Sequence, residues 1–518
     1  MDLQQLLLLL LLTLLPVIIL LILRHKNGRV HRRPPPPGPP GIPVIGNLHQ
    51  FDHSAPHKYL YQLAQKYGPL LSLKLGSLPV VVVSTARMAE EVMKNHDLVF
   101  CSRPPMVGQL KLSYNGLDIA LAPYNEKWRE MRKICVLHLL SIKRVQSFRP
   151  VREDEVSRMI GKIRREAADH KITNLSATVM SYATTLICRV AFGKSYNEED
   201  HEGRRFSNLL RDAQNAFVGF YFTDFFPKIG WLDHFTGRLS RLEKVFQELD
   251  SFYQELIDEH LDYANRPKSM DGDIIDLMLQ LIQVNSSSSS TSSFQLTMDH
   301  IKAMLMDVLF GGTGTSASTI IWAMTALMKN PTMMKKLQNE INDFLEKQQK
   351  TTVDEDDVEK LPYLKAVVKE TLRLYPPAPL LLPRYTVENC VLDGYEVHSS
   401  SIVYVNAWAV ARDPEHWENP DEFLPERFLD GKVNNVDIDI SGREFQFIPF
   451  GAGRRGCPGI SMGLLTVELA LANLLRTFDW ELPPGMKKEG IDTDVVPGLT
   501  MLKKNDLRLF ARQVGATS

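Results

Sequence analysis

Apolar residues recur at helical spacing through most of the chain beyond residue 44, and only short stretches have the pattern of strands. The amphipathic stretches predict helices over residues 152–168, 238–265, 298–329 and 358–374. A hairpin around Gly76 is expected from residues 70–75 and 80–84, with further short strands at 391–397 and 402–405. No internal repeat is present. The pattern therefore predicts a mainly α-helical fold with small β-sheets.

The first residues carry a different pattern. From residue 6 to residue 23 the chain has no charge and consists mostly of Leu and Ile. Eighteen residues at about 1.5 Å each span roughly 27 Å, close to the hydrocarbon core of a bilayer. A signal peptide is the alternative, but its apolar run would be shorter and followed by a small-residue cleavage site. We therefore predict an uncleaved transmembrane anchor at residues 1–23.

The charges that flank this run predict its orientation. Only Asp2 carries a side-chain charge before it, whereas a basic cluster follows at Arg24, Lys26, Arg29, Arg32 and Arg33. By the positive-inside rule, the N-terminus is lumenal and everything after Arg24 is cytosolic.

A proline-rich stretch at residues 34–43 follows the basic cluster and can form neither a helix nor a central strand. It could be a ligand for an SH3-type domain. Because it comes directly after an anchor, residues 24–43 are better interpreted as a stiff basic and proline-rich hinge. The hinge would hold one large catalytic domain, residues 44–518, away from the membrane.

Composition narrows the possible functions. The chain has 60 Lys and Arg against 61 Asp and Glu, a net charge of −1, so no charge excess points to nucleic acid. The cysteines are odd in number and lack zinc-finger spacing, which favours a reduced compartment over a disulfide framework. They are Cys101, Cys135, Cys188, Cys390 and Cys457.

A glycine-rich loop occupies residues 450–459, with the sequence Phe-Gly-Ala-Gly-Arg-Arg-Gly-Cys-Pro-Gly. Gly451, Gly453 and Gly456 satisfy the dinucleotide fingerprint G-x-G-x-x-G, between a strand-like stretch at 445–450 and a predicted helix. However, Pro449 would interrupt a central strand, and the roughly 60 residues that follow cannot complete a doubly wound sheet. The sequence therefore disfavours a dinucleotide site.

Cys457 gives this loop a better interpretation. Its glycine neighbours let the backbone approach a flat ligand, and a helix that begins just after it would stabilise a thiolate. An isolated cysteine is more often a small buried apolar residue. The whole frame F-x-x-G-x-R-x-C-x-G, however, resembles the haem-binding signature of the cytochrome P-450 monooxygenases, and it is matched at Phe450, Gly453, Arg455, Cys457 and Gly459. The resemblance implies that Cys457 ligates the haem iron.

Other motifs extend the resemblance. Glu370 and Arg373 lie on one face of a predicted helix and can pair, although such pairs are common on helices. Together with Arg427 they are similar to the family's Glu-Arg-Arg network, whose implied role is to hold the segment that supports the cysteine loop. Residues 405–414 and 423–428 look like the plant A-type branch (clan 71) of the family.

Four residues are expected near the haem carboxylates. Trp128 and Arg132 match the family's W-x-x-x-R pattern, and Arg384 and Arg455 stand where the family has further arginines. The physical demand is clear, because two carboxylates in a low-dielectric site need fixed cations. Without the other motifs, Trp128 would be interpreted as a core aromatic residue.

The helix predicted at 298–329 contains Gly311, Gly312 and Gly314, although each mid-helix glycine costs about 1 kcal/mol relative to alanine. The helix could stop and restart there. The resemblance implies instead a local widening of the helix, which makes room for dioxygen over the haem. Gly314 stands where the family usually has an acid, while Thr315 keeps the alcohol, so we expect proton delivery to be weakened.

The resemblance covers nearly the whole chain and implies a cytochrome P-450 fold behind a single N-terminal transmembrane helix. The implied cofactor is heme b, with electrons from NADPH through a separate flavoprotein, NADPH-cytochrome reductase, and cytochrome b5 is a further candidate partner. One oxygen atom from dioxygen would enter a hydrophobic specialised metabolite, on the cytosolic side of the endoplasmic reticulum membrane. No nucleic-acid partner is expected.

Two other functions remain open. A haem-thiolate isomerase or dehydratase would act without reductase, and the missing acid before Thr315 slightly favours it; NADPH dependence separates it from a monooxygenase. A non-catalytic haem-binding protein would show no turnover. Substrate contacts are expected in five segments, residues 101–123, 206–222, 304–315, 377–382 and 498–501, of which Leu380, Leu381 and Leu382 make an aliphatic wall.

Overall fold

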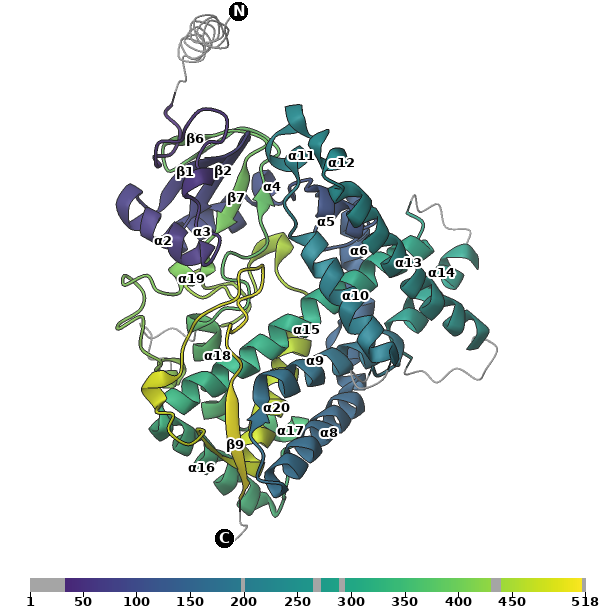
Figure 1. Cartoon of the computed structure of the whole chain (residues 1–518), viewed down its shortest axis with the longest axis vertical. Helices are drawn as coiled ribbons and strands as arrows, with labels where there is room; N and C mark the ends of the chain where they lie inside the picture. Colours follow the sequence, from purple (N-terminus) through teal and green to yellow (C-terminus); the bar gives the residue numbers. More distant parts are fainter. Residues whose placement is uncertain (1–32, 197–200, 264–271, 288–293, 430–438, 515–518) are drawn as a thin grey trace, which may run out of the picture.

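A computed structural model describes residues 33–196, 201–263, 272–287, 294–429 and 439–514. These residues form a mainly helical body with small sheets (Figure 1), which confirms the predicted fold class. The anchor predicted at residues 1–23 lies outside the described residues, as do most of the basic residues after it.

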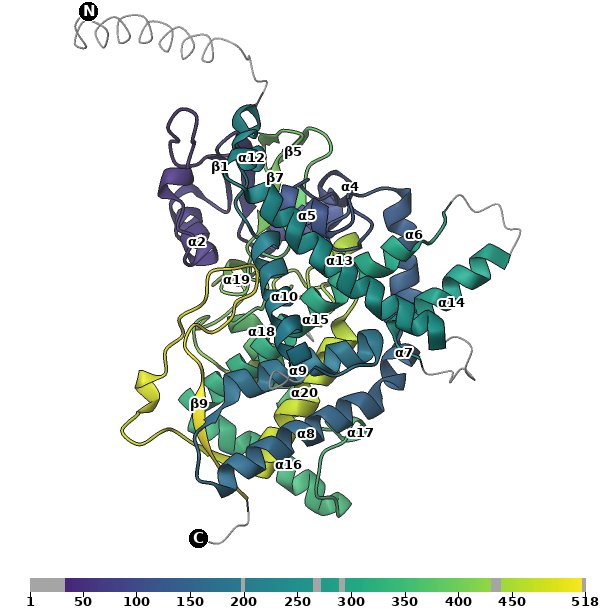
Figure 2. The ribbon, with the colours of Figure 1, turned by 45° about the vertical axis from the view of Figure 1, so that its right-hand side comes forward.

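The long helix α15 (Met298–Lys329) runs through the middle of the body (Figure 2). It packs against α9 (Leu175–Phe192), α18 (Pro362–Leu374) and α20 (Ile460–Thr477). Within the described residues, α9 and α20 are long and apolar enough to cross a membrane, but most of each is buried inside the body. They are therefore core helices of this fold.

The remaining helices surround this centre. The longer ones are α2 (Pro56–Tyr67), α8 (Arg149–Ala168), α10 (His201–Phe217), α13 (Arg238–Tyr263), α14 (Ile274–Ser287) and α16 (Pro331–Gln348). The shorter ones are α3 (Ala86–Glu90), α4 (Asp97–Phe100), α5 (Val107–Leu112), α6 (Glu126–Ile134), α7 (Ile142–Ser147), α11 (Phe222–Phe225), α12 (Leu232–Phe235), α17 (Glu355–Val358) and α19 (Ala407–Val410).

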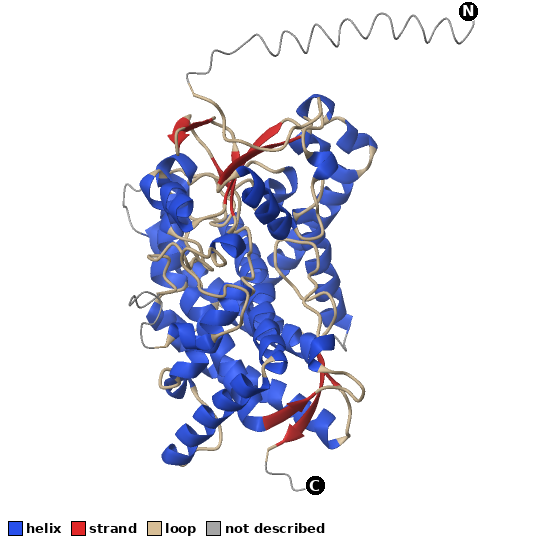
Figure 3. Cartoon of the chain, turned by 90° about the vertical axis from the view of Figure 1, so that its left-hand side faces the viewer, coloured by secondary structure: helices blue, strands red, loops and turns tan. Residues whose placement is uncertain are grey.

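The strands form small sheets near the two ends of the body (Figure 3). One sheet has the order β1 (Leu70–Leu75), β2 (Leu78–Val83), β7 (Ile402–Val405) and β4 (Arg384–Tyr385), and only its β2–β7 pair is parallel. The second has the order β3 (Thr173–Asn174), β9 (Arg508–Gln513) and β8 (Phe478–Glu481). The third is a hairpin of β5 (Cys390–Leu392) and β6 (Tyr395–Val397).

Two predicted elements are divided in the structure, each at a residue with a clear physical effect. The helix expected over 358–374 is split into α17 and α18, because Pro362 takes the first position of α18 and cannot continue a preceding helix. The strand expected over 391–397 is a hairpin, because Asp393 and Gly394 both adopt positive φ and form its turn. The dinucleotide interpretation would have required a strand at residues 445–450. The structure has none there.

The described part of the proline-rich segment lies against the first sheet. The backbone N–H of Ser72 donates to the carbonyl of Pro37 (2.8 Å), and the Ser72 hydroxyl donates to the carbonyl of Pro36 (2.6 Å). The backbone N–H of Glu396 donates to the carbonyl of Pro34 (2.9 Å). Residues 34–37 are therefore fastened to the body.

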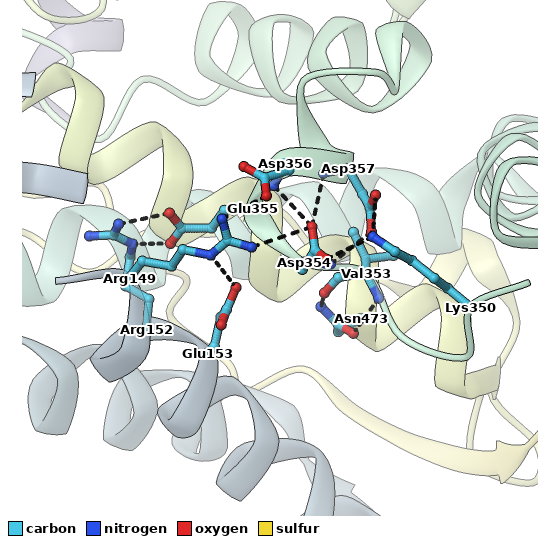
Figure 4. A network of polar contacts seen from close by, with 10 residues as sticks. All are labelled: Arg149, Arg152, Glu153, Lys350, Val353, Asp354, Glu355, Asp356, Asp357 and Asn473. Carbon is cyan, nitrogen blue, oxygen red and sulfur yellow. Dashed lines mark hydrogen bonds and ion pairs between the residues drawn. The ribbon is translucent and has the colours of Figure 1, made fainter. Parts of the chain in front are cut away.

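A polar network ties α20 to the segments around it (Figure 4). Arg152 of α8 is fully buried and forms a two-pronged ion pair with Glu355 of α17, and its third nitrogen lies 3.1 Å from the sulfur of Met462 in α20. Further along α20, the amide of Asn473 exchanges hydrogen bonds with the backbone of Val353. Helix α20 is thus contacted by Arg152 near its start and by Val353 near its other end.

Candidate functional site

The loop at residues 450–459 is shaped by its glycines and by hydrogen bonds within the loop. Gly453 adopts a φ of +69°, and a Cβ there would come within 2.3 Å of the carbonyl oxygen of Met93, so only glycine fits. The N–H of Cys457 donates to the carbonyl of Phe450 across the loop (2.9 Å). The loop therefore presents Cys457 just before α20 begins at Ile460.

The thiol of Cys457 differs from those of the other cysteines. Cys457 is the only exposed cysteine, although protein surrounds it closely enough that burial raises the pKa of its thiol. Both observations fit a sulfur that faces an internal space. The N–H of Gly459 donates to Sγ (3.3 Å), and this bond and the charge of Arg132 act in the opposite direction and lower the pKa.

The other four cysteines lack such an environment. Burial raises the pKa of Cys135 to about 12 and that of Cys390 to about 11. Burial likewise raises the pKa values of Cys101 and Cys188, which are both fully buried. A metal ion needs a reachable thiolate, so Cys457 is the cysteine best suited to bind one.

Helix α15 has accessible residues at Gly311 and Thr315, here called the open stripe, on a face that is otherwise buried. Its backbone stays α-helical across the glycines, so the helix does not stop and restart there. The room comes from absent side chains: Gly311 is exposed, and a Cβ there would meet no atom within 4 Å. By contrast, a Cβ on Gly312 would lie 2.6 Å from the side chain of Ile187. Thr315 is one turn beyond Gly311, and its hydroxyl donates to the Gly311 carbonyl (2.6 Å).

Arg455 and Trp128 are brought together as expected. The guanidinium of Arg455 lies 4.1 Å from the centre of the Trp128 ring, a cation–π contact between the cysteine loop and α6. Arg455 donates to the carbonyls of Cys101 (2.7 Å) and Ala122 (2.6 Å). Burial lowers the pKa of Arg455 to about 10, and its neighbouring arginines add to this shift. The positive charge here exceeds what local carboxylates neutralise.

Arg384 reaches the same loop from strand β4. Its guanidinium donates to the carbonyl of Ala452 (2.9 Å) and to the carboxylate of Asp97 (3.0 Å), and burial lowers its pKa. Asp97 also accepts from Arg454 (2.8 Å). Sequence reasoning missed Asp97, because a lone acid in a short helix gives no signal before the fold brings it beside two arginines.

Arg132 connects the cysteine loop with the open stripe. It donates to the carbonyl of Gly456, and its charge acts on both Cys457 and Asp307. Asp307 lies two turns before Thr315 on α15 and accepts from the N–H of Ile119 (2.8 Å). Burial and the neighbouring Asp118 raise the pKa of Asp307 well above its ordinary value. Sequence reasoning missed that Asp307 ties the segment around Ile119 to α15, because the two are far apart in the chain.

Glu370, Arg373 and Arg427 form the buried network that the motifs predicted. Arg373 donates twice to Glu370 (2.7 and 2.8 Å), and Arg427 donates to it once (3.3 Å). The remaining N–H groups of Arg373 bind three backbone carbonyls, and those of Arg427 bind two, all between residues 411 and 422. The network thus fixes the segment that leads towards the cysteine loop.

These residues fit an iron porphyrin. They provide one reachable thiol for the metal, a helix stripe without side chains, and buried guanidiniums that lack enough carboxylate partners. The soft sulfur suits iron, and the guanidiniums suit the porphyrin carboxylates. The charge of Arg132, which acts on both Cys457 and Asp307, supports the same arrangement.

Three comparisons with known proteins agree with this geometry. The family model described as cytochrome P-450 matches residues 36–510. The chain is similar to 6,7,8-trihydroxycoumarin synthase of Pastinaca sativa, at 50% identity over 91% of both chains, and equally to 5-OH-xanthotoxin synthase of Ammi majus. It is 45% identical to cytochrome P-450 71A9 of Glycine max, over 92% of both chains.

A solved structure shows the same fold. A zebra fish cytochrome P-450 with progesterone superposes with a TM-score of 0.71 and 24% identity, over 88% of this chain and 99% of that chain. The family model and the plant relatives together identify the group to which the chain belongs. It is a member of the cytochrome P-450 family, of the plant A-type, and hence a haem-thiolate monooxygenase of specialised metabolism that receives electrons from NADPH through a reductase.

Proposed function

We propose that Cys457 would ligate the haem iron of a membrane-anchored monooxygenase that hydroxylates a flat aromatic lactone of the coumarin type. The observation that carries the ligand assignment is the reachable Sγ of Cys457, held at the start of α20 by the Gly459 N–H. The substrate class is supported by two relatives whose names specify hydroxylated products, 6,7,8-trihydroxycoumarin and 5-OH-xanthotoxin.

The other site residues hold the cofactor and shape the space beside it. Arg384, Arg455, Arg132 and Trp128 are proposed to bind the haem carboxylates, in exchange for some of their present backbone acceptors. Phe450, Gly453 and Gly459 set the loop, and Glu370, Arg373 and Arg427 stabilise the segment before it. Haem bound here supplies reductive dioxygen activation: substrate, O₂, NADPH and H⁺ give hydroxylated substrate, H₂O and NADP⁺.

Gly314 and Thr315 are proposed to act on proton delivery. The Thr315 hydroxyl is oriented by the hydrogen bond that it donates to the Gly311 carbonyl. Its lone pairs stay free to accept a hydrogen bond from a proton donor in the open stripe. Gly314 offers no side chain for this purpose. Proton delivery then depends on groups outside α15.

The basic face of α6 is proposed as the docking surface for the reductase. A surface hollow of about 410 Å³ lies between α6 and the cysteine loop, and it is lined by Trp128 and Arg132 from the site. Arg129, Lys133 and Arg454 line it as well, and their side chains are about half exposed or more. Positive charge near the cysteine loop favours an acidic partner surface. Cytochrome b5 is proposed as a second partner of the same face.

Apolar side chains support attachment to the endoplasmic reticulum membrane. Val44 is 74% exposed and Phe235 is 82% exposed, and Trp231 is also exposed. The segments that carry these side chains meet at the turn after β1. There the N–H of Gly76 donates to the Ile45 carbonyl, and the N–H of Ser77 donates to the Phe225 carbonyl. Helices α11 and α12 lie at the same end of the molecule as this turn (Figure 1). An anchor at residues 1–23 would bring this end to the lipid surface.

The test is reconstitution of the purified chain with reductase, NADPH and a panel of coumarins. The proposal predicts a hydroxylated product that carries one oxygen atom from labelled O₂ and requires NADPH. Product formed without NADPH or reductase would establish the isomerase or dehydratase function instead. Spectral binding of coumarins with no product under any condition would establish a non-catalytic haem protein.

A further inference from the structure

Gly314 faces a threonine from the C-terminal part of the chain. A Cβ on Gly314 would lie 3.9 Å from both Oγ1 and Cγ2 of Thr500. This is ordinary van der Waals contact, so the place where the family usually has an acid is open and bordered by a hydroxyl. Both residues are partly accessible.

The position of Thr500 is fixed by its neighbour Met501. The Met501 carbonyl accepts hydrogen bonds from the Ser318 hydroxyl (2.7 Å) and from the Trp322 indole N–H (2.8 Å). Gly314, Ser318 and Trp322 are spaced four residues apart and therefore lie on one face of α15. The Met501 N–H also donates to the Pro377 carbonyl (2.8 Å). Thr500 is thus held against the Gly314 position by two buried donors on the same helix face.

Thr500 is the threonine near this niche whose proton is available. The hydroxyl of Thr315 already donates to Gly311, and that of Thr313 donates to Leu309 (2.8 Å) and is buried. A hydroxyl has one proton and two lone pairs, so both can still accept but not donate. Among the described residues, no side-chain or backbone group forms a hydrogen bond with the hydroxyl of Thr500.

We propose that Thr500 takes over the positioning task of the missing acid: its hydroxyl donates a hydrogen bond to a water molecule in the Gly314 niche, and that water donates one hydrogen bond to a free lone pair of Thr315. Thr500 keeps its own proton and acts as a positioning residue. The second O–H bond of the water breaks as its proton goes to the reacting oxygen, and the hydroxide that remains takes up a proton from solvent. The inference rests on the proposed function, because it concerns how that reaction obtains its protons.

The overall stoichiometry shows what would change without this water. The coupled reaction converts substrate, O₂, NADPH and H⁺ into hydroxylated substrate, H₂O and NADP⁺. When proton delivery fails, O₂, NADPH and H⁺ give H₂O₂ and NADP⁺ instead, and the substrate is released unchanged. Loss of the Thr500 hydroxyl therefore predicts less product and more peroxide for each NADPH consumed.

The experiment compares wild type with Thr500→Val, Thr500→Ser, Thr493→Val and the double variant Gly314→Asp/Thr500→Val. Valine removes the hydroxyl at equal volume, serine keeps it, and Thr493 is a control on the same segment. Product, peroxide and NADPH are measured together, with a coumarin that wild type hydroxylates. Substrate affinity from the spectral shift on binding and thermal unfolding of each variant are measured independently of turnover.

Thr500→Val should lower product per NADPH by about tenfold, less than the roughly 10²–10⁴-fold of a positioned general acid, because Thr500 orients a water and is not itself the acid. Thr500→Ser and Thr493→Val should stay within about twofold of wild type, and Gly314→Asp should restore coupling to the valine variant, because its carboxylate fills the niche. Substrate affinity should stay within about threefold throughout. An unchanged ratio of product to NADPH in Thr500→Val would overturn the role of Thr500, and so would a loss of substrate affinity without a loss of this ratio. Either result would leave the proposed function standing. NADPH-independent product in wild type would overturn the proposed function as well.

Discussion

Replacement of Glu370 by glutamine tests whether the buried ion network supports the fold as its geometry indicates. Glu370 is fully buried and accepts two hydrogen bonds from Arg373, one from Arg427 and one from the backbone N–H of Leu424 (2.8 Å). In Glu370→Gln one oxygen becomes an NH₂ group that faces guanidinium donors, and the negative charge is lost. Two buried guanidiniums then have no counter-charge.

The cost can be estimated from general magnitudes. Removing one partner of a buried ion pair costs about 3–5 kcal/mol. The entropy of unfolding, about 2.1 cal/mol/K per residue, amounts to about 1 kcal/mol/K over roughly 480 residues. Glu370→Gln should therefore lower the unfolding temperature by about 3–5 °C. It should also reduce haem content, because Arg373 and Arg427 would no longer hold residues 411–422 in place.

Glu468→Gln is the matched control, since Glu468 is also a buried glutamate but lies on α20 without two arginines. Burial raises its pKa to about 7, from 4.5 in an exposed carboxyl. A carboxyl whose pKa is raised by folding destabilises the protein progressively as pH rises from about 4.5 to 7. Glu468→Gln should thus gain about 1–3 kcal/mol at pH 8 and nothing at pH 4. Thermal unfolding of both variants by circular dichroism at pH 8 should show shifts of opposite sign; equal shifts would refute the distinction between a paired and an unpaired buried glutamate.

Three further predictions concern α15 and the topology. Gly311→Ala should be more stable to denaturant than Gly312→Ala by about 1 kcal/mol, because only the second must displace a neighbouring side chain, and equal midpoints would contradict this. Thr315→Ala should release more peroxide and form less product per NADPH, and wild-type values for both would show that its hydroxyl is not used. The N-glycosylation sequences at Asn174-Leu-Ser176 and Asn285-Ser-Ser287 should carry no glycan in microsomes, because the predicted orientation keeps them in the cytosol. A mass shift that a glycosidase removes would show that the orientation is the reverse of the predicted one.

The sequence predicted best those features that depend on local patterns. Residues 298–329 were expected as one helix, and α15 has these limits, because apolar packing on all sides outweighs the helix propensity lost at three glycines. The frame around Cys457 predicted a loop of defined shape, because Gly451 and Gly453 adopt positive φ, which favours glycine. The turn at Asp393-Gly394 could have been predicted as well, since this dipeptide favours a tight hairpin.

Features that arise from distant segments could not be predicted in this way. Asp97 matters because the fold sets it beside Arg384 and Arg454, and no spacing in the sequence carries that information. Segments 304–315 and 498–501 were both expected at the substrate site, but the pairing of Thr500 with Gly314 arises because Met501 binds α15, and no local pattern carries it. Partner residues of this kind require the tertiary structure.

The central claim is that the Cys457 thiolate ligates the haem iron. It is tested most directly by the carbon monoxide difference spectrum of the reduced protein, recorded for wild type, Cys457→Ser and Cys101→Ser. Wild type and Cys101→Ser should give the thiolate-type absorption maximum, as expected for cysteine-ligated haem. Cys457→Ser should lack that maximum while the chain remains folded. A normal thiolate-type spectrum in Cys457→Ser would contradict the account.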